Sequence, residues 1–259
     1  MTTTRQADDS PQAETSAPVY VYGVVRGGLI GELAVDGVAN RPVATIERDG
    51  LAAITSELTE EPLRVRRRDL RAHLGVLEAA FAEATIVPCA FGMVLHSRQA
   101  VESDLLTARR EELLELLGRL EGRVQLNIKA AYDEETVLRE VVEADPEIAR
   151  LRRQSRALGD AGHMANIHLG EAVASALSER RAADERRILD RLSAEANDVV
   201  VEEASATVVL KASFLVDRER SERFDAALES LAAAEAPRLT FESIGPLPPT
   251  AFAALEARG

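Results

Sequence analysis

The chain has 259 residues, enough for one large domain or two ordinary ones. Only 3% of the residues are aromatic and none is Trp, which argues against stacking platforms for bases or sugars. Its formal net charge of −13 repels phosphate backbones and anionic lipid headgroups, so neither nucleic acid nor a membrane is an expected partner. Cys89 is the single cysteine, which excludes an intrachain disulfide and a thiolate zinc site, and no apolar run approaches the ~20 residues of a membrane span.

The N-terminal part of the chain begins without apolar periodicity. Residues 1–17 are rich in Thr, Ser, Asp, Gln and Pro, and they predict a disordered leader with no signal peptide, which favours a cytoplasmic protein. The sequence VYVYGVV at residues 19–25 then predicts a strand buried on at least one face. Residues 43–47 and 51–55 flank Arg48-Asp49-Gly50, and a short Asp-Gly connection between β-rich runs predicts a hairpin.

A helix follows, with Leu70, Leu74, Leu77 and Phe81 spaced to form one apolar stripe that we expect to lie on a sheet. Residues 86–95, IVPCAFGMVL, predict a buried strand with a bend or bulge. A helix capped by Ser97 is expected to extend to about residue 117. Its expected inward residues are Val101, Leu105, Leu113 and Leu117. Alternation in residues 123–132 predicts a further strand, so the first half reads β-ββ-α-β-α-β.

From Asp133 the pattern becomes helical. Asp133 is an expected helix cap, and Pro146 begins another helix. Residues 160–195 predict one long helix or two nearly collinear ones. Strands are expected at 198–203, 207–216 and 239–244, with a helix at 221–234 between the last two. Gly245-Pro246 is expected to break the last strand, and Pro248-Pro249 to stop sheet pairing. The overall fold class is therefore α+β.

No arrangement of side chains predicts catalysis, a cofactor or a metal. Cys89 lies within an apolar run, where burial raises a thiol pKa, so an inert core cysteine is favoured over a nucleophile. His163 and His168 are five residues apart, unlike the i, i+4 spacing of zinc-binding helices. No phosphate-binding glycine loop is present. The basic run at residues 64–71 is interpreted as a charged helix entry, with contact to an acidic partner as the alternative.

Three segments together resemble the gas vesicle protein family GvpF/GvpL. They are the strand VYVYGVV, the central IVPCAFGMVL and the tail GPLPPTAF, and the likeness runs over about residues 18–252. The matching positions are Tyr22, Gly23, Pro88, Phe91, Gly92, Gly245, Pro246, Pro248, Pro249 and Phe252. Met93, Leu247 and Thr250 depart from the family pattern.

The resemblance implies two domains. These are an N-terminal ferredoxin-like α/β sandwich at residues 18–132 and a C-terminal α/β domain with long helices at residues 133–259. It also implies a gas vesicle assembly accessory or minor structural protein that binds the hydrophobic shell protein GvpA. Other gas vesicle accessory proteins are further expected partners. The resemblance further implies that the protein has no catalytic activity and no cofactor. It also implies a location in the cytoplasm in association with gas vesicles.

Two surfaces are candidates for contact with the shell protein: the exposed side of the 160–195 helix and the tail after Gly245. The alternative function is a small-molecule-binding regulatory protein, or an enzyme, built on ferredoxin-like domains. That alternative predicts a deep pocket with convergent polar groups, whereas an assembly protein predicts a shallow apolar surface.

Overall fold

The computed structural model describes residues 17–59, 66–158, 163–205 and 207–256. All but the last residue of the predicted leader, and the first part of the basic run, lie outside the described residues. The chain divides into two compact units. Unit 1 contains residues up to Leu117 and from Leu255 onward, and unit 2 contains Gly118–Ala254.

This division differs from the predicted boundary after residue 132. Strand β6 (Arg123–Tyr132) alternates in burial as expected, but it pairs with β8 (Val208–Asp217) and β9 (Leu239–Leu247) of unit 2. Backbone pairing to strands far along the chain therefore places residues 118–132 in the second unit.

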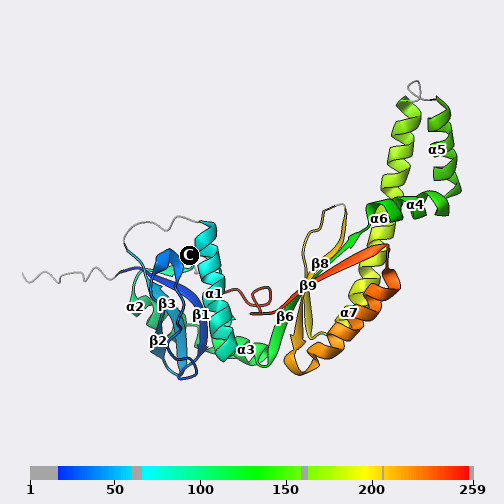
Figure 1. The fold of residues 1–259 in the computed structure, drawn as a ribbon. Helices are drawn as coiled ribbons and strands as arrows, with labels where there is room; N and C mark the ends of the chain where they lie inside the picture. The colour runs from blue at the N-terminus through cyan, green and yellow to red at the C-terminus, as the bar shows by residue number, and fades with distance from the viewer. Residues whose placement is uncertain (1–16, 60–65, 159–162, 206, 257–259) are drawn as a thin grey trace, which may run out of the picture. The chain divides into compact units, whose positions relative to one another are not determined.

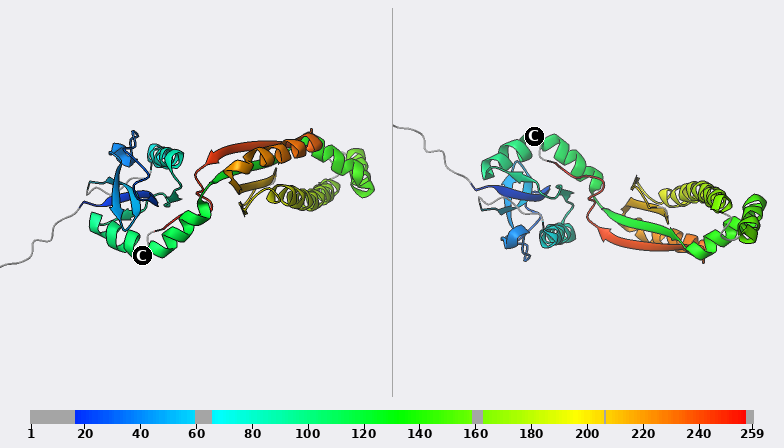
Figure 2. Two further views of the ribbon diagram at one scale, coloured as in Figure 1. Left: turned by 90° about the horizontal axis from the view of Figure 1, so that it is seen from below. Right: turned by 90° about the horizontal axis from the view of Figure 1, so that it is seen from above.

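Unit 1 is built on an antiparallel sheet of order β2-β3-β1-β4, with β5 also paired to β1 (Figure 1). Its elements are β1 (Val19–Arg26), η1 (Val38–Asn40), β2 (Ala44–Arg48), β3 (Leu51–Glu57), α1 (Arg67–Glu83), β4 (Val87–Pro88), β5 (Val94–Leu95), α2 (Arg98–Ala100) and the π-helix η2 (Val101–Thr107); α3 (Arg110–Leu120) spans the boundary. Seven of the eight residues of β1 are buried, because α1 lies on one face of the sheet and the α2–η2 segment on the other (Figure 2).

The predicted hairpin is confirmed. Arg48 pairs with Leu51 across a two-residue turn in which Asp49 has φ 50° and Gly50 has φ 80°. Positive φ at both positions is the type I′ turn that matches the twist of the two strands.

The apolar stripe of α1 does not lie wholly on the sheet. Leu70 and Leu74 are 44% and 41% exposed, whereas the buried line runs through Asp69, His73 and Leu77. The inward face is rotated from the predicted one because polar residues occupy part of it. Two leucines of the stripe consequently remain on the surface.

The segment 86–95 forms two short strands rather than one bent strand. β4 and β5 both pair with β1, and residues 89–93 between them leave the sheet through Gly92 at φ 92°. The next helix begins as predicted, since Ser97 Oγ accepts a hydrogen bond from the Ala100 amide. It continues through a π-helical segment into α3. All four residues predicted to point inward are buried.

Unit 2 has a four-stranded antiparallel sheet of order β7-β8-β6-β9. Its remaining elements are α4 (Glu134–Ala144), α5 (Pro146–Leu158), α6 (His163–Ser193), β7 (Asp198–Val201), η4 (Arg218–Arg220) and α7 (Ser221–Glu235). Helices α6 and α7 lie against the sheet, whose other face carries polar groups such as the Lys129–Glu242 ion pair (Figures 1 and 2).

The ferredoxin-like order of elements, expected for the N-terminal domain, is complete in unit 2 and lacks one helix in unit 1. Unit 2 contains the complete β-α-β-β-α-β order, with α4–α6 as the first helical connection and α7 as the second. Unit 1 has the same strand order, but residues 27–43 replace the first helix. That segment contains four glycines and Pro42, which disfavour a helix.

Strand β9 continues past its predicted end. Leu247 still pairs with Gln125, and the register shifts between Gln125 and Asn127. Gly245 permits this close approach, because a Cβ there would lie 2.8 Å from the Gln125 carbonyl oxygen. Gly245-Pro246 therefore bends the strand without ending it.

Within the part of the chain that the structure describes, every helix falls short of the length and apolarity that crossing a bilayer requires. The fold class, α+β with two antiparallel sheets, is as predicted.

Candidate functional site

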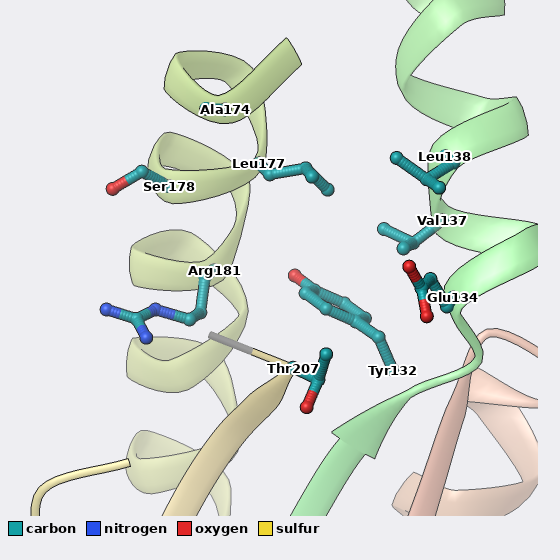
Figure 3. Close-up of a pocket in the computed structure, with 9 residues that line it drawn as sticks. All are labelled: Tyr132, Glu134, Val137, Leu138, Ala174, Leu177, Ser178, Arg181 and Thr207. Atoms are coloured by element: carbon teal, nitrogen blue, oxygen red, sulfur yellow. The ribbon is translucent and has the colours of Figure 1, made fainter. Parts of the chain in front are cut away.

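The candidate site is a groove of about 380 Å³ in unit 2, between α4 and α6. Val137 and Leu138 of α4 face Leu177 of α6 across it, and the ring of Tyr132 forms its base (Figure 3). The other lining residues are Glu134, Ala174, Ser178, Arg181 and Thr207. The walls are therefore mainly apolar, and polar side chains lie at the rim.

Local sequence signals build this groove. Strand β6 ends at Tyr132, and Asp133 immediately caps α4 by accepting a 2.9 Å hydrogen bond from the Thr136 amide. Because the helix begins directly after the strand, Val137 and Leu138 are placed beside the Tyr132 ring. Leu177 completes the opposite wall from the middle of α6.

A buried ion-pair network lies under the base. The Tyr132 hydroxyl donates to Asp184 Oδ2 at 2.6 Å, and Arg187 donates to Asp184 Oδ1 at 2.8 Å. Arg238 also pairs with Asp184, whose exposure is only 4%. Burial, together with the hydrogen bond to the carboxylate, raises the pKa of Tyr132. The phenol therefore stays protonated and committed to Asp184.

The network continues into the surrounding helices. Arg238 also pairs with Glu235 of α7, and Arg180 of α6 pairs with Glu140 of α4. Three helices and the end of β6 are thus joined beneath the groove. The carboxylates of this network are paired with arginines, so the apolar walls are the part of the groove without ion pairs.

Metal-binding side chains are not clustered in the described residues. No group of three or more His, Cys, Asp or Glu side chains there could hold a metal ion. His163 and His168 are exposed near the start of α6. Cys89 is buried, and this burial raises its thiol pKa to about 12, as expected for an inert core cysteine.

The family-motif residues of β1 and β4 determine how closely these strands approach. Gly23 lies opposite Pro88, and a Cβ on Gly23 would be 2.8 Å from the Val87 carbonyl oxygen. The Tyr22 hydroxyl accepts a 2.7 Å hydrogen bond from the Val38 amide and lies 2.9 Å from Ser56 Oγ. These motif positions are internal and structural.

Phe91 and Gly92 lie in the loop between β4 and β5. The Phe91 ring meets the His73 ring edge-on at a centroid distance of 5.5 Å. The Gly92 amide donates to the Tyr20 hydroxyl at 3.0 Å. Phe91 therefore packs against α1, which carries His73, whereas Gly92 is bonded to Tyr20 of β1.

The C-terminal tail does not form the free contact surface that we expected. Pro248, Pro249 and Phe252 are buried, and the Ala251 amide donates to Gln125 Oε1 at 2.9 Å. Of the tail segment GPLPPTAF, Gly245, Pro246 and Ala251 are exposed. The tail is thus built into the fold, whereas the 160–195 helix does supply one wall of the groove.

Sequence reasoning missed the opposite wall and the residue below it. The helical pattern that follows Asp133 runs through Val137 and Leu138 but does not indicate what they face, and Asp184 is not among the predicted site residues. A signal for Asp184 was present, because it occupies the same helical line as the buried Ile188 and Leu192, at i, i+4 and i+8.

Known proteins resemble this chain over nearly its whole length. The family described as "Gas vesicle synthesis protein GvpL/GvpF" matches residues 18–254. "Gas vesicle protein F" of Streptomyces sp. (strain CB03234) is 38% identical over 90% of this chain and 98% of its own length. "Gas vesicle protein L" of the same strain is 28% identical over 91% of this chain and 92% of its own length.

A solved structure agrees with the fold. The crystal structure of the gas vesicle protein GvpF from Anabaena sp. PCC7120 is 25% identical and superposes with a TM-score of 0.81, covering 93% of this chain and all of that one. On the extent of the family match and on the 38% identity, this chain belongs to the gas vesicle synthesis protein GvpL/GvpF family.

Proposed function

We propose that this protein is an assembly accessory or minor structural protein that binds the hydrophobic shell protein GvpA during gas vesicle formation. Family membership gives the role in gas vesicles, and the apolar groove between α4 and α6 supports the binding step. A shell subunit carries apolar surface that aggregates unless another protein covers it before assembly. The groove would receive an apolar side chain of that subunit.

The walls of the groove favour protein binding over catalysis. Its central residues, Val137, Leu138 and Leu177, are aliphatic, and the Tyr132 hydroxyl at its base is bound to Asp184. An enzyme or small-molecule sensor needs several polar groups that point into the pocket and are available to a ligand. The protein therefore acts without a reaction or cofactor of its own, in the cytoplasm and on the growing vesicle.

The proposed partners follow from the charge as well as the groove. GvpA is the principal one, and other gas vesicle accessory proteins can bind elsewhere on the surface. The net charge of −13 opposes binding to nucleic acid and to anionic membranes.

The direct test is a titration of the purified chain with GvpA fused to a soluble carrier. We expect saturable binding, and we expect Leu138→Glu and Leu177→Glu each to weaken it at least about tenfold, since burying a leucine contributes roughly 1.5–3 kcal/mol. Both side chains are partly exposed, so the fold should tolerate the changes.

Val201→Glu is the matched control, because it introduces the same charge at a 44%-exposed apolar residue of unit 2 that does not line the groove. Its affinity should equal that of the unchanged chain. Absence of binding at micromolar concentrations would reject the proposed function, whereas binding unaffected by the groove variants would reject only the groove as its site.

A further inference from the structure

Helix α1 of unit 1 carries an uncovered apolar strip on its outer side. Leu70 and Leu74 are one helical turn apart and are 44% and 41% exposed. Most apolar side chains of this unit are buried, including Leu77 of the same helix. Neighbouring exposed leucines on a rigid helix form the kind of ridge that packs into the groove of another helix.

The inner side of α1 is fixed, so the leucines cannot turn inward. The Tyr20 hydroxyl lies 2.9 Å from His73 Nδ1, and the His73 ring N–H donates to the Cys89 carbonyl oxygen. One turn earlier, buried Asp69 accepts a 3.4 Å hydrogen bond from the Ala39 amide. Rotating the helix to bury Leu70 and Leu74 would break all these contacts and expose the carboxylate-bearing side.

The same end of α1 is strongly basic. Arg66, Arg67 and Arg71 are exposed, and none of them pairs with a carboxylate in the described part of the chain. Exposed arginines also gather on α5, at Arg152, Arg153 and Arg156, but at α1 they stand beside exposed leucines of the same helix. In a chain of net negative charge, they create a local positive potential next to the leucine strip.

From this combination we propose that the outer face of α1 is a docking surface for a partner protein that presents an amphipathic helix, with aliphatic residues one turn apart and Asp or Glu beside them. Leu70 and Leu74 pack against the aliphatic residues, and Arg67 and Arg71 pair with the acidic ones. The net negative charge of the chain opposes an acidic partner, so the arginines beside the leucines favour docking at this face. This surface belongs to unit 1 and is separate from the groove in unit 2.

The probe for this surface is a pair of fluorescent synthetic peptides designed as helices. One carries leucines at i, i+4 and i+7 with flanking glutamates, and the other replaces each glutamate by lysine. Titration of the full-length chain, followed by fluorescence anisotropy, should show binding of the glutamate peptide at least about tenfold tighter than that of the lysine peptide.

Variants separate the two components of the surface. The double variant Arg67→Glu with Arg71→Glu should reverse the peptide preference, because it exchanges the charge without touching the leucines. The double variant Leu70→Glu with Leu74→Glu should weaken binding of the glutamate peptide at least about tenfold. Leu29→Glu, at a leucine that is 55% exposed elsewhere in unit 1, is the matched control and should have no effect.

Circular dichroism of each variant should match that of the unchanged chain, because all the altered side chains are exposed. The proposal is overturned if the glutamate peptide fails to bind, if both peptides bind equally, or if the α1 variants behave like Leu29→Glu. It is also overturned if anionic phospholipid vesicles bind the chain through Arg67 and Arg71 while the glutamate peptide does not.

Discussion

His73 is a histidine enclosed by aromatic side chains, with only 3% of its surface exposed. Tyr20, Tyr22 and Phe91 all lie within ring-contact distance, and Phe91 is a family-motif residue. Burial lowers the pKa of His73 to about 4, although its hydrogen bond to the Cys89 carbonyl partly opposes this shift. The imidazole is therefore neutral in the folded chain at any pH above this range.

This shift predicts a dependence of stability on pH. The unfolded chain protonates His73 near pH 6.5, whereas the folded chain does so only near pH 4, so the unfolded state binds more protons between these values. The free energy of unfolding should fall as the pH is lowered from about 6.5 to 4, by on the order of 3 kcal/mol from this residue. Urea denaturation followed by circular dichroism at several pH values measures it.

His73→Gln is the control, because glutamine can donate and accept hydrogen bonds but does not titrate. It should be less stable at pH 7 and should lose the His73 part of the pH dependence. A slope between pH 4 and 6.5 that is equal in both proteins would show that His73 is not responsible. The neighbouring titratable groups Tyr20, Tyr22, Cys89 and Asp69 are present in both proteins, so the comparison isolates the contribution of the imidazole.

At the scale of helices and strands, the sequence predicted which elements form better than it predicted which side of each element faces the core. The hairpin at Asp49-Gly50, the Ser97 and Asp133 caps and the helix expected at 221–234 follow from local chemistry, and all are present. The inward face of α1 was predicted less well, and Asp184 of α6 was not predicted to be buried. Apolar spacing alone does not reveal that Asp69 and His73, or Asp184, lie on a buried face, because their partners come from distant segments.

The candidate groove was predictable only in part for the same reason. The sequence indicated the long helix that supplies Leu177, but the facing wall of Val137 and Leu138 depends on where β6 ends and on how α4 packs. The extension of β9 past Gly245 likewise depends on pairing with β6, more than a hundred residues earlier. Tertiary contacts of this range leave no periodic signal in the chain.

Asp184 provides the test at this scale. Asp184→Asn removes the charge that compensates Arg238, a guanidinium that is 11% exposed, and weakens the bond to the Tyr132 hydroxyl. Removing one partner of a buried ion pair costs about 3 kcal/mol or more. We expect a corresponding loss in the free energy of unfolding at pH 7, measured by urea denaturation.

Asp190→Asn is the matched control on the same helix, since Asp190 is exposed and has no ion pair in the described residues. Its effect should stay within about 0.5 kcal/mol, as is usual for surface substitutions. Equal effects of the two substitutions would mean that the network under the groove does not stabilise α6.

For the molecule as a whole, the chain passes from unit 1 to unit 2 after Leu117 and returns to unit 1 at Leu255. The return is anchored by the central family motif. The Leu255 amide donates to the Pro88 carbonyl at 3.0 Å, and the Ala90 amide donates to the Leu255 carbonyl at 2.8 Å. The segment at Leu255 therefore helps to complete unit 1.

This closure makes unit 1 sensitive to a change near the C-terminus. Leu255 is 3% exposed, so Leu255→Ala should destabilise unit 1 by about 2–3 kcal/mol. Hydrogen exchange with mass spectrometry should show faster exchange in β1 and β4, while β6 and β8 keep their protection. Glu256→Ala is the control, because Arg109 contacts the Glu256 backbone carbonyl, which this substitution retains. If Leu255→Ala accelerated exchange in β6 and β8 instead of β1 and β4, the C-terminal residues would be stabilising unit 2, and the closure of unit 1 by its last residues would be wrong.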